Sequence, residues 1–184
     1  MVLKDMEYKV KYRNIKYPRL EFKTGRLELI LPFGKNPTEL IERHSRWINK
    51  KQKFITDCLK DAKDKEIFER DKKDFKILVN TYIKDLSNTL GVNTNKIFFR
   101  KMRTKWASCS SKRNLTINTL MKFLPEYLIE YIIYHELVHL IEKRHNDRFW
   151  ELISKRFKNH QKLETSLFHY WFLLNSLERI KKHA

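Results

Sequence analysis

The feature that most restricts how this chain can fold is an apolar run from Tyr127 to Ile141, within which His135, Glu136 and His139 stand. Apolar side chains in the run point almost all the way round a helix, a pattern typical of a buried helix. Pro125 and the acidic Glu126 suit its first turn. A charge buried in such a helix must be paired, neutralised or bound to a metal. The run therefore predicts a core helix with a polar site built into it.

His135, Glu136 and His139 form an HExxH motif within this predicted helix. Side chains four residues apart lie on one helical face, with about 5–6 Å between their Cβ atoms, so both histidines can bind one ion. Glu136 follows His135 by about 100° of rotation, which places its carboxylate beside the ion and near a metal-bound water. The motif has only three fixed letters and also occurs by chance. Taken singly, each residue is more often an ordinary core histidine or exposed charge.

A catalytic zinc site usually has three protein ligands and an open fourth position. We interpret His145 as the third ligand, because it follows His139 by six residues, the offset of the metzincin pattern HExxHxxGxxH. That pattern has glycine where this sequence has Glu142. Glu142 is a rival ligand, although such a glutamate more often hydrogen-bonds to a metal ligand or faces solvent. Glu151 and Glu164 are weaker rivals of the same kind.

Four segments around the motif carry a further pattern: RTKWASCSS at 103–111, NLTIN at 114–118, HELVHL at 135–140 and HNDRFW at 145–150. Together they resemble the YgjP-like metallopeptidases, whose pattern is similar to R-x-K-T-R-W-G-S-C-S, a strand, HELxHL and H-x-x-x-F-W. The resemblance extends more loosely over residues 6–158. The sequence departs from the family at Ala107, where glycine is usual, and in a longer helical tail after Asn159. The HExxH-x5-H and Phe-Trp arrangement is also similar to the SprT and Wss-type proteases, which cleave proteins crosslinked to DNA.

The resemblance implies a zincin-like α+β metallopeptidase domain in which the three histidines hold Zn²⁺ and Glu136 is the general base. The implied reaction is hydrolysis of a peptide bond, in a peptide or protein substrate, by a metal-activated water. It also suggests that a strand beside the active-site helix, at 96–102 or at 115–123, pairs with extended substrate. The alternative is a plain sheet core with a solvated loop, 103–114, between the two strands.

The net charge of the chain gives information about its binding partners rather than about its fold. Forty lysines and arginines against 22 aspartates and glutamates give a formal net charge of +18. This imbalance favours nucleic acid, and the implied similarity to crosslink-cleaving proteases makes DNA-bound proteins candidate targets. Basic residues gather in pairs at Lys50-Lys51, Lys72-Lys73, Lys112-Arg113 and Lys181-Lys182. The alternative is a lysine-rich surface that only solvates a heat-adapted protein.

A second hypothesis for the function is a nucleic-acid-binding protein whose metal is structural. Closed structural zinc sites usually have four ligands and often cysteines, which a three-histidine set lacks. Cys58 and Cys109 are too few for a disulfide framework, and the sequence shows no apolar signal or membrane-length run, so we expect a cytoplasmic protein with no membrane association. Cys109 is a candidate inhibitory zinc ligand, although a small buried residue is the more frequent interpretation.

The N-terminal stretch alternates between apolar and charged residues, which predicts a three-stranded antiparallel β meander with its turn at Thr24-Gly25. Pro18 indicates an edge position for the second strand. Asn36 and Pro37 predict the start of one long helix. The residues expected on its inner side are Leu40, Ile41, Trp47, Ile48, Phe54 and Ile55.

The charged stretch from Lys60 to Lys73 is either a solvated helix or a hinge, and it suggests a boundary between lobes. We place an N-terminal lobe at residues 1–73 and the metallopeptidase core, with its helical tail, at residues 74–184. Three further amphipathic helices are predicted in the core. One lies at 75–90 with Gly91 at its C′ position, one follows an N-cap in the turn His145-Asn146-Asp147, and one lies around 163–177.

Overall fold

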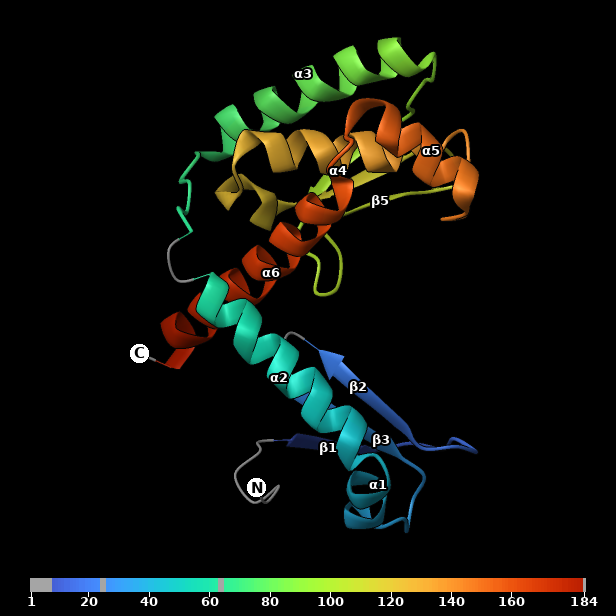
Figure 1. Cartoon of the computed structure of the whole chain (residues 1–184), viewed down its shortest axis with the longest axis vertical. Coiled ribbons are helices and arrows are strands. Elements are labelled where there is room, and N and C mark those ends of the chain that lie inside the picture. Colours follow the sequence, from blue (N-terminus) through green and yellow to red (C-terminus); the bar gives the residue numbers. More distant parts are fainter. Residues whose placement is uncertain (1–7, 24–25, 63–64, 184) are drawn as a thin grey trace. The chain divides into compact units, whose positions relative to one another are not determined.

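The computed structural model of the chain describes residues 8–23, 26–62 and 65–183 (Figure 1). It is an α+β protein, as the sequence predicts, with two three-stranded sheets and several helices in the described residues. The elements divide into two compact units. The first, here called the N-terminal unit, comprises Met1–Lys63 and Trp171–Ala184, and the second, the metal-site unit, comprises Asp64–Tyr170.

The N-terminal unit contains a sheet of β1 (Tyr8–Tyr12), β2 (Arg19–Lys23) and β3 (Arg26–Leu31). The strand order is β1-β3-β2, with β1 parallel to β3 and β2 antiparallel to it, so the predicted antiparallel meander is wrong. The most apolar strand takes the centre, because its leucines and isoleucine are all 5% exposed or less. β2 follows Pro18 and lies at the edge, as expected. The predicted turn Thr24-Gly25 lies outside the described residues.

Two helices pack on this sheet, where one was predicted. α1 (Pro37–Arg43) begins as expected, with the Asn36 side chain accepting from the Thr38 N–H at 2.9 Å. His44 then leaves helical geometry before α2 (Ser45–Asp61) begins. Trp47 and Phe54, which were expected on the inner side, are exposed. The core that forms consists of Leu27, Leu29, Leu31, Leu40, Ile41 and Ile48.

The metal-site unit begins with α3 (Lys72–Leu90), which Asp71 caps and which ends at Gly91 with a φ of 64°, as its predicted C′ role requires. Its sheet has the order β4-β6-β5, from β4 (Ile97–Arg100), β5 (Ala107–Cys109) and β6 (Leu115–Asn118). The predicted loop 103–114 thus contains a strand.

The strand predicted at 115–123 ends earlier than expected. β6 stops at Asn118, whose side chain accepts from the Leu120 N–H at 3.1 Å and starts the short 3₁₀ helix η2 (Thr119–Phe123). The side-chain oxygen offers the chain a local bond that competes with the strand ladder. A 3₁₀ helix therefore replaces the second half of the predicted strand.

The apolar run forms α4 (Glu126–Val138), which packs against α3, β5 and α5 and is buried almost all round, as predicted. It ends at His139, before the lysine and arginine expected to close it. Asn146 caps α5 (Asp147–Arg156), as expected, and accepts from the Phe149 N–H at 3.0 Å. α6 (His160–His183) follows. In the described part of the chain, no helix is both long enough and apolar enough to cross a membrane.

Candidate metal centre

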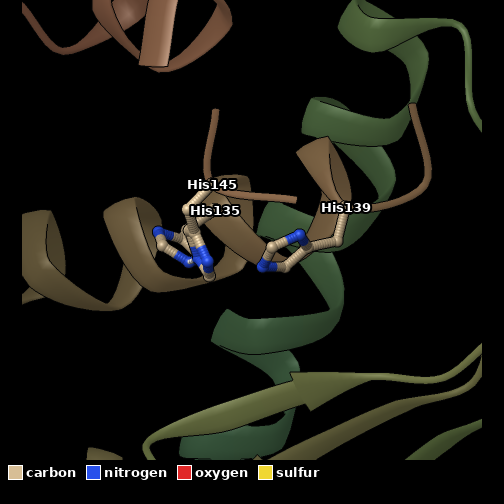
Figure 2. Close-up of side chains that lie close together, drawn as sticks. All are labelled: His135, His139 and His145. Carbon is tan, nitrogen blue, oxygen red and sulfur yellow. Dashed lines mark hydrogen bonds between the residues drawn. The ribbon is translucent and has the colours of Figure 1, made fainter. Parts of the chain in front are cut away.

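Three histidines from two neighbouring segments meet at the end of α4. His135 lies in its last turn, His139 is its C-cap, and His145 precedes the cap of α5. The Nε2 atoms of His135 and His145 are 3.1 Å apart. One possible ligand atom from each of the three residues lies within 4.8 Å of the others, and Figure 2 shows the rings gathered. This donor set fits a metal ion.

The chain turns from His139 to His145 without a glycine. Leu140 N–H donates to Leu137 O and Ile141 N–H donates to Val138 O, both at 2.9 Å, so α4 closes in a tightened last turn. Arg113 is the one non-glycine residue with a positive φ in the described part of the chain. The turn therefore needs no left-handed residue, which explains why Glu142 can stand at the metzincin glycine position.

The environments of the ring nitrogens indicate which atoms are free to bind metal. His139 Nδ1 lies 3.2 Å from the carbonyl oxygen of Glu142, and a carbonyl can only accept. His139 Nδ1 therefore carries the hydrogen, which leaves the Nε2 lone pair for an ion. His135 Nδ1 faces Glu164 Oε1 at 3.8 Å, and the same oxygen accepts from the Tyr131 hydroxyl at 2.5 Å.

Electrostatics favour the neutral form of His135 and of His139, since the pKa of each is lowered. Burial, together with the proximity of His139 and His145, lowers the pKa of His135 to about 3. The pKa of His139 is also lowered, mainly by burial. Because a metal ligand must offer a lone pair, rings that resist protonation have the form that binding requires.

Glu136 lies next to the triad in a buried position. Burial raises the pKa of its carboxyl to about 7, against the opposing effects of a backbone hydrogen bond from Cys109 and the positive charge of Lys105. Cys109 belongs to β5, so the edge strand and α4 together hold this carboxylate. It lines the same cavity as the three histidines.

Phe149 supports all three rings, a role that the sequence did not reveal. It is fully buried, and its ring centroid lies 4.9 Å from that of His135, 4.7 Å from His139 and 4.6 Å from His145. Its helical spacing indicates only a core residue. The available signals were its place four residues after His145 and its membership of the Phe-Trp pair in the family pattern.

A cavity of about 720 Å³ opens over the triad. One wall is formed by β5 and the turn after it, and the other by α4. β5 is an edge strand, whereas β6 is paired on both sides and has no free edge for a substrate. The strands predicted at 96–102 and 115–123 thus do not line the cavity, whereas β5 does. Basic side chains also line it: Lys105, Arg113 and Lys143.

The rival ligands take other positions. The Glu142 carboxylate accepts from the Arg144 N–H at 3.2 Å, and Glu151 pairs with Lys155 at 3.5 Å. Glu164 comes closest, through its contacts with Tyr131 and His135. Among the described residues, the cluster able to hold an ion contains the three histidines and neither these carboxylates nor Cys109.

Ala107 also adopts an ordinary conformation, although the resembling family has glycine there. It is buried in β5 and pairs with Ile117 across the sheet. Because its φ is not positive, a Cβ atom causes no backbone strain at this position. The departure from the family pattern therefore leaves the wall of the cavity intact.

The fold and the site define an α+β protein with a candidate metal centre on a buried HExxH helix. Residues 58–170 match the YgjP-like metallopeptidase domain, and the chain belongs to this family. Family membership implies a metal ion, which the histidine triad could bind.

Individual relatives match about half of the chain. The UTP pyrophosphatase of Escherichia coli (strain K12) is 29% identical over 89 residues, which are 48% of this chain and 50% of that protein. The chain thus spans about half the length of this curated relative. The metallopeptidase zymogen of Pyrococcus abyssi abylysin is 24% identical, with a TM-score of 0.43 over 47% of this chain and 87% of that one. The zymogen of Methanocaldococcus jannaschii jannalysin is 28% identical, with a TM-score of 0.44 over 48% and 84%.

Proposed function

We propose that this chain is a zinc metallopeptidase in which His135, His139 and His145 hold the ion and Glu136 is the general base. The observation that carries the proposal is the convergence of three imidazoles beside a buried carboxylate in one open cavity. Neutral imidazole is a donor that suits zinc, and three protein ligands leave a position for water. Bound there, zinc would lower the pKa of that water to about 7.

The chain's own residues supply the remaining chemistry. Glu136 would take a proton from water in the cavity and return it to the leaving amine. The Cys109 N–H would hold the Glu136 carboxylate in place through its backbone hydrogen bond. The outer edge of β5 offers backbone groups to an extended peptide, a common mode of peptide recognition.

The test is Glu136→Gln, which removes the base and leaves the three ligands. We expect normal zinc content and a loss of peptide hydrolysis of about 10²–10⁴-fold, the usual contribution of acid–base catalysis. Bound metal and cleavage of an unfolded protein are measured together. Glu151→Gln is the matched control, because this exposed carboxylate pairs with Lys155 on the surface of α5. Full activity in Glu136→Gln would refute the mechanism.

A second candidate function is hydrolysis of a phosphoanhydride in a nucleoside triphosphate. The name of the Escherichia coli relative suggests it, and the cations Lys105, Arg113 and Lys143 in the cavity favour it. Cationic clamps stabilise transferring phosphoryl groups. Pyrophosphate release from UTP, measured beside peptide cleavage, separates the two activities. Release without peptide cleavage, and dependent on Glu136, would replace the peptidase proposal.

We also propose DNA-bound proteins as natural targets. The net charge of +18 supports this, as do the exposed pairs Lys50-Lys51 and Lys112-Arg113, whereas the side chains of Lys181-Lys182 lie outside the described residues. The test compares cleavage of one DNA-binding protein free and on DNA. Cleavage that does not depend on DNA would restrict the function to general peptide hydrolysis.

The cavity beside a set of only three candidate ligands supports a metallopeptidase over a nucleic-acid-binding protein with a structural metal, because closed structural sites usually have four ligands.

A further inference from the structure

One end of the N-terminal sheet carries aromatic rings among basic side chains. β1 and β3 are parallel, so both finish at the same end. The chain leaving β1 then crosses the end of β3, where the Arg13 N–H donates to the Leu31 carbonyl at 2.9 Å. The segments 13–18 and 32–36 therefore start side by side. We call the surface they form the basic–aromatic end, and it consists of Tyr12, Arg13, Lys16, Tyr17, Phe33 and Lys35.

The three aromatic rings of this surface are exposed to solvent. Phe33 is 72% exposed, Tyr17 67% and Tyr12 46%. Tyr12 and Phe33 lie 6.3 Å apart between ring centroids, with an interplanar angle of 21°. A tight turn presents Phe33: the Lys35 N–H donates to the Pro32 carbonyl at 3.3 Å, and Gly34 has the positive φ that the third position of a type II turn requires. Exposed apolar groups gathered in this way mark a binding surface.

The charges on this surface are of one sign. No aspartate or glutamate occurs in residues 8–20 or 31–36, and Arg13, Lys16 and Lys35 are exposed. The Lys16 ammonium lies 5.3 Å from the centre of the Tyr17 ring. Aromatic faces with cations between them are the combination that binds single strands, because bases stack on the rings and phosphates contact the cations. A surface built to dock an apolar protein would not gather exposed cations in this way.

We propose that the basic–aromatic end binds single-stranded nucleic acid, with bases stacked on its three rings and phosphates held by its basic side chains. The site goes beyond hydrolysis at the metal centre and does not rest on it, because it belongs to the N-terminal unit. It also lies outside the residues that match the family. Stacking and phosphate contacts read neither the base nor the 2′-hydroxyl, so DNA and RNA strands bind alike.

The first test removes rings from the full-length protein. Binding of a short fluorescent oligothymidine is followed by anisotropy for wild type, Tyr17→Ala and Phe33→Ala. Loss of a stacked base should weaken binding roughly tenfold for each ring. Phe98→Ala is the matched control, because this ring of β4 is 46% exposed and lies in the other unit. Both native rings are largely exposed, so thermal unfolding should be unchanged.

The second test concerns the cations. Lys16→Glu and Lys35→Glu should weaken binding and reduce the salt slope, by about 0.7 for each phosphate of a single strand that the variant no longer neutralises. Lys84→Glu makes the same change of charge at an exposed position on α3, in the other unit, and should leave the salt slope unchanged. An oligouridine of the same length should bind like oligothymidine, and a duplex should bind more weakly because its bases are already stacked.

Three outcomes would overturn the proposal. The first is no binding of either oligomer at low salt. The second is an equal effect of Phe33→Ala and Phe98→Ala, which would leave only general phosphate attraction or a protein partner for the exposed rings. The third is tighter binding of the duplex than of the single strand. Peptide hydrolysis is measured separately, so failure here is distinguishable from failure of the peptidase.

Discussion

Phe149→Ala should lower the affinity for the metal ion by more than its effect on the stability of the core explains. The native ring is fully buried and lies within 4.9 Å, centroid to centroid, of each of the three imidazoles. Removing it takes away the surface against which the three histidine rings pack. Ion binding must then order the rings as well as coordinate the metal, and this ordering lowers the affinity.

The expected magnitudes follow from these ring contacts. Truncating a buried phenylalanine costs about 3–5 kcal/mol of unfolding free energy, within the roughly 5–15 kcal/mol that a domain has. Ring contacts contribute about 0.5–1.5 kcal/mol each beyond burial. We therefore expect the loss of the three ring contacts to lower the metal affinity about 10–100-fold. This is the usual effect of mutating a residue that orients metal ligands, and it corresponds to about 1.4–2.8 kcal/mol.

The assay is competition for zinc against a chelator, with urea unfolding measured on the same samples. Ile153→Ala is the matched control, because Ile153 is also fully buried in α5 but has no ring to stack against the imidazoles. It should cost about 2–5 kcal/mol of stability and leave the zinc affinity unchanged. An equal fall in zinc affinity for both variants would refute the reasoning, since global stability would then explain it.

Three further predictions concern single residues. His145→Ala should leave a folded protein, because this side chain is exposed, and should lower zinc affinity sharply; unchanged metal content would refute the assignment of His145 as the third ligand. Asn118→Ala should cost about 2–4 kcal/mol in urea unfolding, because the fully buried amide donates to the carbonyls of Met102 and Lys105, at 2.9 and 2.7 Å, and its removal leaves buried polar groups unpaired. A cost under about 1 kcal/mol would mean that water replaces the amide. Cys109 should be alkylated about 100-fold more slowly than a free thiol near neutral pH in the metal-free protein, because burial and then the charge of Glu136 raise its pKa to about 11. The rate should rise as pH increases toward that value, and a rate like that of a free thiol would show that the group is solvated.

Local signals in the sequence predicted the element that matters most. The apolar run predicted α4, and its HExxH spacing predicted that two histidines meet on one face. Caps were also readable: Asn36, Gly91 and Asn146 all stand where expected. These predictions succeed because a helix repeats within a few residues, so both the pattern and its caps are local.

Strand pairing was less accessible. The meander prediction assumed that successive strands pair, whereas β1 pairs with β3, because burial of the leucines of β3 decides which strand is central. β5 was hidden in a Ser-, Lys- and Arg-rich stretch, and its three residues become a strand only by pairing with β6. A strand's propensity depends on its neighbours far more than a helix's does.

The amino-acid sequence specifies the chemistry available to this protein: three imidazoles, the carboxylate next to one of them, and a helix apolar enough to bury them. The environment of these groups comes from tertiary contacts. They bring Phe149 beneath the three rings, the Glu142 carbonyl to His139, and the edge strand β5 over Glu136. These contacts depend on how the chain turns and how the strands pair. Strand pairing is selected by burial of the whole core rather than by any local sequence pattern.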